Sequence, residues 1–258
     1  MQLSDKDKKY IETYSHLSLS FEDFKAMAKN ESLSLSEKIG FPEAYRDGLE
    51  SIILQDISNK IKSLNKYQKN ILDIGSGCSG LTTEIIQKAK ENNHKLILCD
   101  SQEMLDLIAD EECVNKISGK FPYNLDKFSH LANSLDGIIV YSVLQHIILE
   151  DSIFNFIDSS LELLKPGGEM LIGDIPNISK RERFFRSETG IKYHQNFTKS
   201  NSLPEDTSGT LKKNKIDDSI MFSILQRYRN SNYETYLLSQ DSRLPMSNRR
   251  EDILIVKN

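Results

Sequence analysis

The sequence predicts a doubly wound α/β domain built on a mostly parallel sheet. Short apolar runs bounded by turn residues alternate with helical patterns between residues 69 and 176. The runs are apolar throughout and do not alternate with polar residues, as expected of strands that helices cover on both faces. The length of 258 residues is sufficient for one such domain with an appended part, and it argues against a repeat array.

The predicted elements follow in order along the chain. Residues 1–66 are polar and mainly helical in pattern, and apolar residues spaced by three and four between Tyr45 and Leu64 predict one amphipathic helix. Strands are expected at 71–74, 96–99, 137–141 and 170–175, with helices between them at 81–91 and 152–164. Asp151 is a candidate N-cap for the last of these helices.

The regular pattern stops after Pro176 for about forty residues, and long irregular segments of this kind are usually functional or disordered. The pattern resumes with a helix at 216–230 and two β-rich stretches at 233–238 and 252–256. We therefore divide the chain into an N-terminal helical cap or lid at 1–66 and a sheet domain at 67–258, which contains an insertion at 176–215.

The composition disfavours several classes of protein. Lys and Arg number 33 and Asp and Glu 38, which gives a net charge of -5, and 38% of the residues are hydrophobic. This balance disfavours intrinsic disorder and general coating of nucleic acid. Three irregularly spaced cysteines predict no disulfide framework, and five scattered histidines predict no metal site. The chain has no apolar run long enough to span a membrane, so we expect a cytoplasmic protein.

A glycine-rich run joins the first predicted strand to the next helix. Gly75, Gly77 and Gly80 have the spacing G-x-G-x-x-G, which lets the backbone turn sharply beside the positive end of a helix. This spacing is compatible with a dinucleotide whose ribose would meet Asp100. Asp73, two residues before Gly75, would instead repel a pyrophosphate and attract a cationic or amino-bearing ligand such as a sulfonium amino acid.

Four motifs occur in a fixed order along the sheet domain. They are Asp73-Ile-Gly-Ser-Gly77, Leu98-Cys-Asp100, Tyr141-Ser-Val-Leu-Gln-His146 and Leu164-Lys-Pro-Gly-Gly168. Together they resemble the class I S-adenosylmethionine-dependent methyltransferases over residues 67–175. The resemblance implies a seven-stranded sheet with an antiparallel edge hairpin, S-adenosylmethionine as methyl donor and S-adenosylhomocysteine (SAH) as product. An NAD(P)-dependent oxidoreductase or epimerase and a catalytically inactive cofactor-binding protein are the alternatives.

The resemblance also implies a set of cofactor contacts. It places Asp100 on the ribose hydroxyls, although capping of the next helix would also explain this residue. The family often has an acidic residue after its third strand to contact adenine, but residues 116–122 contain none. Apolar neighbours are expected at the adenine instead. The full predicted set is Asp73, Gly75, Ser76, Gly77, Asp100, Ser101, Met104, Phe121 and Tyr141.

Three residues are candidates for catalysis. His146 follows the fourth predicted strand, whose carboxyl end faces the ligand crevice in this class of sheet, and it could take a proton from an acceptor hydroxyl. A purely structural histidine is the alternative. Tyr141 could shape the methyl-transfer pocket or be a core aromatic residue. Asp174 could be an alternative base, a group that orients the acceptor, or a turn residue.

The insertion at 176–215 is basic within an acidic chain. It has nine basic and four acidic residues, a charge of +5, so the remainder carries -10. We expect it to bind a small anionic acceptor through Arg181, Arg183 and Arg186, because guanidinium groups fork onto phosphate or carboxylate oxygens. His194 is a further candidate. A solvated charged face is the alternative interpretation.

Other residues extend the predicted acceptor site. Arg249 and Arg250 either join the basic patch or flank a β edge. Tyr45 and Arg46 are expected on the lid, with ordinary helix packing as the alternative. RNA as acceptor is disfavoured, because the chain is acidic and has no recognisable RNA-binding module. The combination of core, lid and the stretch 173–181 is similar to small-molecule methyltransferases of bacterial surface-polysaccharide pathways, which implies O-methylation of a sugar, phosphate or phosphoramidate.

Overall fold

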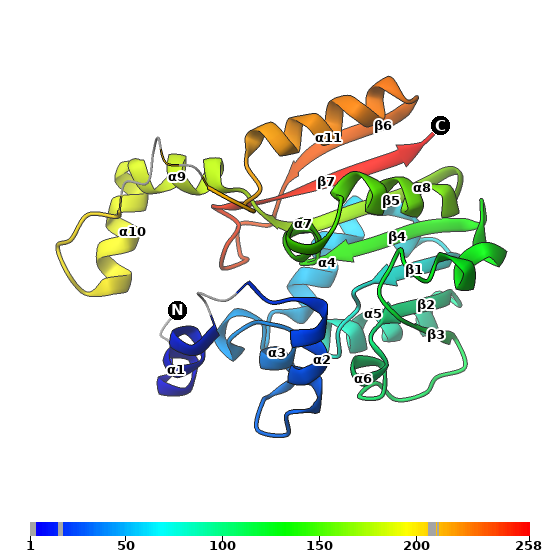
Figure 1. Cartoon of the computed structure of the whole chain (residues 1–258), viewed down its shortest axis with the longest axis horizontal. Helices are drawn as coiled ribbons and strands as arrows, with labels where there is room; N and C mark the ends of the chain where they lie inside the picture. The colour runs from blue at the N-terminus through cyan, green and yellow to red at the C-terminus, as the bar shows by residue number, and fades with distance from the viewer. Residues whose placement is uncertain (1–3, 15–17, 206–209, 211) are drawn as a thin grey trace.

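A computed structural model describes residues 4–14, 18–205, 210 and 212–258 of the chain (Figure 1). Its centre is a seven-stranded sheet in the order β3-β2-β1-β4-β5-β7-β6. The strands are β1 (Asn70–Ile74), β2 (Lys95–Asp100), β3 (Val114–Ser118), β4 (Leu135–Tyr141), β5 (Leu164–Pro176), β6 (Tyr233–Ser239) and β7 (Arg250–Lys257). Strands β1 to β5 pair in parallel, whereas β7 runs antiparallel to both β5 and β6. The predicted doubly wound sheet and its antiparallel edge hairpin are confirmed.

The strand order reverses between β1 and β4. In the middle of the sheet Ile71 of β1 lies between Leu96 of β2 and Gly137 of β4, and all three strands run in the same direction. A reversal of this kind opens a crevice at the carboxyl ends of the strands. Ligand-binding side chains are expected at that edge.

Helices cover both faces of the sheet (Figure 1). On one face Ile53 and Ile85 pack in a core with β1 and β2, and on the other Phe156 and Ile224 pack in a core with β4, β5 and β7. Each side chain of this size, when fully buried, contributes about 1.5–3 kcal/mol. The helices of the sheet domain are α5 (Gly80–Glu91), α6 (Gln102–Leu105), η3 (Leu125–Leu131), α7 (Leu144–Glu150), α8 (Ile153–Leu163) and α11 (Asp218–Asn230). Among the described residues, none of the helices combines the length and the apolar character that a membrane crossing requires.

The N-terminal part consists of short helices. They are α1 (Asp5–Tyr14), α2 (Phe21–Lys29), α3 (Leu35–Lys38), η1 (Glu43–Tyr45), α4 (Glu50–Lys60) and η2 (Lys62–Asn65). The single helix predicted between Tyr45 and Leu64 is therefore shorter than expected, because the backbone turns at η1 before it and at η2 after it.

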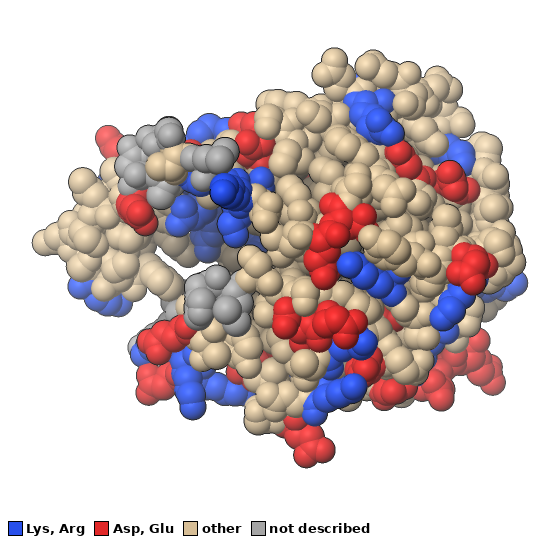
Figure 2. Space-filling view, viewed as in Figure 1, with Lys and Arg blue, Asp and Glu red and all other residues tan. Residues whose placement is uncertain are grey.

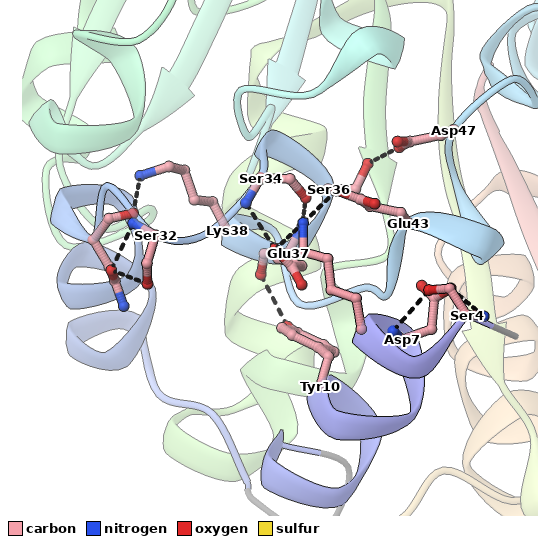
Figure 3. Close-up of polar contacts among 12 residues, drawn as sticks. Ser4, Asp7, Tyr10, Ser32, Ser34, Ser36, Glu37, Lys38, Glu43 and Asp47 are labelled. Atoms are coloured by element: carbon pink, nitrogen blue, oxygen red, sulfur yellow. Dashed lines mark hydrogen bonds and ion pairs between the residues drawn. The ribbon is translucent and has the colours of Figure 1, made fainter.

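Polar contacts join these short helices (Figure 3). The Tyr10 hydroxyl on α1 donates to the Glu37 carbonyl oxygen on α3 at 2.9 Å. The Lys38 ammonium donates to the Asn30 carbonyl oxygen just after α2 at 2.7 Å. Asp7 accepts a hydrogen bond from the Ala44 amide of η1 at 3.2 Å. These hydrogen bonds, together with the apolar packing of Tyr10, Leu19 and Met27, give the segment a defined conformation.

Two helices occupy the segment that the sequence predicts to be irregular. They are α9 (Ile178–Arg186) and α10 (Glu188–Thr198), and they project from the sheet domain as an arm (Figure 1). The prediction was wrong because α9 buries no residue and so has no buried apolar stripe to reveal it. Asn177 and Ser187 cap the two helices, and the rings of Phe184 and Tyr193 pack at 5.6 Å between centroids. Residues 206–209 and 211 of the predicted insertion lie outside the described residues.

Candidate active site

The glycine loop follows β1 at the crevice edge of the sheet. Gly75 and Gly77 have φ angles of +73° and +61°, a region that residues with a side chain rarely adopt. A Cβ on Gly75 would lie 2.5 Å from a methyl group of Val143, and a Cβ on Gly77 would lie 2.7 Å from a methyl group of Ile39. The loop therefore requires glycine both for its conformation and for the close approach of its neighbours.

A cavity lies over this loop, between the carboxyl ends of β1, β2 and β4 and the N-terminal helices. We call it the first cavity. Eight of the nine predicted cofactor residues line it: Asp73, Gly75, Ser76, Gly77, Asp100, Met104, Phe121 and Tyr141. Ser101 does not, because its hydroxyl instead accepts a hydrogen bond from the Met104 amide and caps α6. Phe24, Ile39 and Phe41 of the N-terminal part close the opposite side.

Two acidic side chains reach this cavity from neighbouring strands. Asp100 accepts hydrogen bonds from the Gly77 amide at 2.8 Å and the Ser101 amide at 2.6 Å, and burial nevertheless raises its pKa to about 6. Burial, together with the charge of Asp100, raises the pKa of Asp73 to about 7. Among the described residues no donor contacts the Asp73 carboxyl group. The pair is suited to a ligand that brings its own amino or hydroxyl donors.

His146 lies in the first turn of α7, not at the end of β4 as the sequence suggested. Its Nδ1 is 3.2 Å from the Leu19 carbonyl oxygen, and its ring meets Phe24 edge-on at 4.8 Å. A carbonyl oxygen only accepts, so the hydrogen resides on Nδ1, and no donor among the described residues contacts the Nε2 lone pair. Burial lowers the pKa of His146 to about 4, so the imidazole is neutral at pH 7. The ring lines both the first cavity and a second one beside it.

Asp174 is enclosed by positive charge. The guanidinium groups of Arg46 and Arg250 each approach its carboxylate at 2.8 Å, and the Gln240 amide donates to it at 3.1 Å. Burial alone would raise the pKa of Asp174, but the two arginines and the Ser142 hydroxyl bring it below its ordinary value. A carboxylate with this many donors holds cations in place and is poorly suited to accept a proton.

Tyr141 is the last residue of β4, and it is buried. Burial raises the pKa of its hydroxyl well above the usual value, so the group stays neutral. The Arg46 guanidinium lies between this ring and that of Phe41, at 5.6 Å and 3.8 Å from the respective centroids. Tyr45, the other predicted lid residue, lines neither cavity among the described residues. Of the two predicted lid residues, Arg46 is therefore the one that lines a cavity.

The second cavity lies between α7, the start of α9 and the segment before β7. Four basic side chains line it: Arg181, Lys215, Arg249 and Arg250. In Figure 2, lysine and arginine side chains gather at the hollow between the α9–α10 arm and the body of the molecule. Of the four residues that the sequence proposed on the insertion, only Arg181 lines this cavity.

The other three proposed residues have contacts elsewhere. Arg183 pairs with Asp218 at the start of α11, and Arg186 lies 3.8 Å from Glu182 on its own helix. The Nε2 atom of His194 lies 3.2 Å from the Ser202 hydroxyl. Arg249 and Arg250 line the second cavity because the beginning of β7 pairs with the end of β5, where Pro176 lies opposite Arg250. This pairing places both arginines at the crevice edge of the sheet.

No protein-family model matches the chain, and no curated protein matches it in sequence. Solved structures match it in fold. The plantazolicin methyltransferase BpumL, solved with SAH, is 15% identical, covers 97% of this chain and 100% of its own, and has a TM-score of 0.56. The plantazolicin methyltransferase BamL, solved with a triazolic desmethylPZN analog and SAH, is 13% identical, covers 92% and 98%, and has a TM-score of 0.56. The CurJ carbon methyltransferase is 13% identical, covers 99% and 71%, and has a TM-score of 0.57.

The chain has the class I methyltransferase fold. The first cavity lies where the strand order of this fold reverses, and the second cavity lies beside it on the side of β4 and β5. Within the methyltransferase fold the described residues bring together no group of three histidine, cysteine or acidic side chains that could hold a metal ion.

Asp174→Asn is expected to lower the free energy of unfolding by about 3–5 kcal/mol, because it leaves two buried guanidinium groups without a compensating charge. Asparagine keeps the shape of the side chain and tolerates the positive φ of +58° at this position. Urea unfolding measures the change. As a matched control, Asp110→Asn breaks the exposed ion pair with Lys116 and should cost less than about 1 kcal/mol. Equal losses in the two variants would contradict the role given to Asp174.

Proposed function

We propose that this chain is an S-adenosylmethionine-dependent methyltransferase that acts on a small anionic molecule. The observation that carries the proposal is the pair of acidic side chains, Asp73 and Asp100, that open into a glycine-lined cavity at the carboxyl ends of β1 and β2. The cofactor assignment is further supported by the SAH in the BpumL and BamL structures of the same fold.

The residues of the first cavity fit this cofactor. Asp100 would accept hydrogen bonds from the ribose hydroxyls, and Asp73 would meet the amino group of the methionine part. Met104 and Phe121 are buried and offer an apolar surface to adenine. When bound, S-adenosylmethionine supplies an electrophilic methyl group on a sulfonium centre. The acidic pair is also unfavourable for a pyrophosphate, which argues against an NAD(P)-dependent enzyme.

His146 would act on the acceptor side. Its unprotonated Nε2 can take a proton from a neutral hydroxyl group, while the hydrogen bond from Nδ1 to Leu19 fixes the ring. An acceptor whose oxygen is already ionised would need no base. In either case, most of the acceleration would come from the alignment of donor and acceptor where the two cavities adjoin, at His146 and Phe41.

The chemical identity of the methyl acceptor is a further part of the proposal. We propose O-methylation of a sugar, phosphate or phosphoramidate group, with formation of a bacterial surface polysaccharide as the pathway hypothesis. The pathway rests on the sequence resemblance alone. The anionic character of the acceptor is supported by the basic side chains of the second cavity, which adjoins the first at His146 and Phe41.

SAH is expected to bind to the purified protein in calorimetric titration, whereas NADH is not. Asp100→Asn should weaken SAH binding by about 1–3 kcal/mol, because it removes a charged acceptor from the ribose hydroxyls. The affinity of the natural protein should also fall below about pH 6, since a protonated Asp100 carboxyl group is a weaker acceptor.

The control for this titration is Asp106→Asn. Asp106 follows α6 at the surface, where it accepts a hydrogen bond from Gln102, and its replacement should leave SAH binding unchanged. Tight binding of NADH with no response to SAH would overturn the proposed activity. An unchanged SAH dissociation constant in a folded Asp100→Asn variant would instead remove Asp100 from the cofactor site.

The imidazole of His146 is expected to remain neutral, with its hydrogen on Nδ1, from pH 8 down to about pH 5. The physical reason is burial, which lowers the pKa to about 4 and disfavours the charged form. Long-range proton–nitrogen NMR spectra of the labelled protein report both the tautomer and the titration, and the His146→Gln variant assigns the signal. Titration near 6.5, or a hydrogen on Nε2, would exclude the proposed proton-accepting role at Nε2.

A further inference from the structure

The basic side chains of the second cavity have no acidic counterpart among its lining. Arg181 comes from α9 and Lys215 from the segment before α11, whereas Arg249 directly precedes β7 and Arg250 is its first residue. Among the described residues, no aspartate or glutamate lines the cavity with them. Three separate segments of the chain thus direct positive charge into one hollow.

Arg181 differs from the other basic residues of α9 in its ion pairing. Lys180 lies 3.8 Å from Glu251, Arg183 pairs with Asp218, and Arg186 lies 3.8 Å from Glu182. Arg181, in contrast, contacts the ring of Phe185 at 5.0 Å and has no carboxylate partner among the described residues. The basic residues of α9 outside the cavity are therefore neutralised within the protein, and the one that lines the cavity is not.

The other basic residues of the cavity also differ in whether they have a carboxylate partner. Arg249 donates to the Asn248 side-chain oxygen at 3.1 Å and lies 5.9 Å from the centroid of the Tyr193 ring. Neither Arg249 nor Lys215 forms an ion pair with a described residue. Arg250 is held by Asp174. The cavity therefore has three positive charges that have no carboxylate partner among the described residues, at Arg181, Lys215 and Arg249.

The rest of the wall is largely apolar. Aliphatic and sulfur-containing side chains from the N-terminal part, α7, α9 and the segments before α11 and β7 provide it: Leu19, Ile148, Leu149, Ile178, Ile216 and Met246. Simple inorganic anions would make no use of this surface. An organic anion could bury its apolar part here while its charged group meets the guanidinium groups.

We propose that the second cavity binds the acceptor as an amphipathic organic anion, with Arg181, Lys215 and Arg249 on its phosphate or carboxylate group and its apolar part directed toward His146. This inference rests on the proposed function for the identity of the ligand as acceptor. His146 and Phe41 line both cavities, so an apolar part directed toward His146 would reach the place where the second cavity adjoins the first.

Phenyl phosphate, benzoate, inorganic phosphate and benzyl alcohol are suitable probes for calorimetric titration of the full chain. Phenyl phosphate or benzoate is expected to bind at least tenfold more tightly than inorganic phosphate, and benzyl alcohol should not bind measurably. The comparison of the first two probes shows whether the site prefers phosphate or carboxylate. Added salt should weaken the binding of the preferred anion.

The double variant Arg181→Gln/Arg249→Gln should bind the preferred aromatic anion at least tenfold more weakly, whereas Arg183→Gln is the matched control and should stay within twofold of the natural protein. Arg183 lies on the same helix, and its charge is held by Asp218 outside the cavity. SAH titration of the double variant should be unchanged. Failure of SAH binding in the natural protein would overturn the proposed function and not the anion site.

Three results would overturn the anion site itself. They are the absence of binding by both aromatic anions, unchanged binding in the double variant, and a loss in Arg183→Gln as large as that in the double variant. Circular dichroism and the unchanged affinity for SAH show that the double variant is folded, so a loss of anion binding is not a consequence of unfolding.

Discussion

The ion pairs of Asp174 connect the parts of the candidate site. This carboxylate at the end of β5 binds Arg46 of the N-terminal part and Arg250 at the start of β7, and its backbone amide donates to Asp252 within β7 at 2.8 Å. Two buried guanidinium groups without this partner would carry a desolvation cost of several kcal/mol per ion. The N-terminal helices therefore have a fixed position over the sheet edge, where Phe41 lines both cavities.

The two cavities have complementary electrostatic character. The first presents the carboxyl groups of Asp73 and Asp100, which suits a ligand with amino and hydroxyl donors, and the second presents unpaired basic side chains, which suits an anion. His146 lies between them with a neutral ring. A cationic methyl donor would be attracted to the first cavity and an anionic acceptor to the second, so charge as well as shape would direct the two reactants to their positions.

The sequence predicted the parts of this account that depend on local pattern. Apolar runs located the central strands, and the glycine spacing with Asp73 located the loop. It failed at α9, because only three of its nine residues are apolar, Ile178, Phe184 and Phe185, and none of them is buried. The sequence also could not show which basic residues line the second cavity. Arg181 and Arg249 line it together because β7 pairs antiparallel with β5, a contact between distant parts of the chain. Arg46 was expected on a lid, but its partner Asp174, 128 residues away, could not be deduced.

Hydrogen exchange with and without SAH tests the central claim most directly, namely that the first cavity under the N-terminal helices is the cofactor site. SAH is expected to slow exchange both in the glycine loop at 75–77 and in the N-terminal segment at 21–46, because it would contact both walls of that cavity. Exchange in α10, which lines neither cavity, should stay the same. Protection of the arm alone, or no protection in the loop and the N-terminal segment at saturating SAH, would contradict the account.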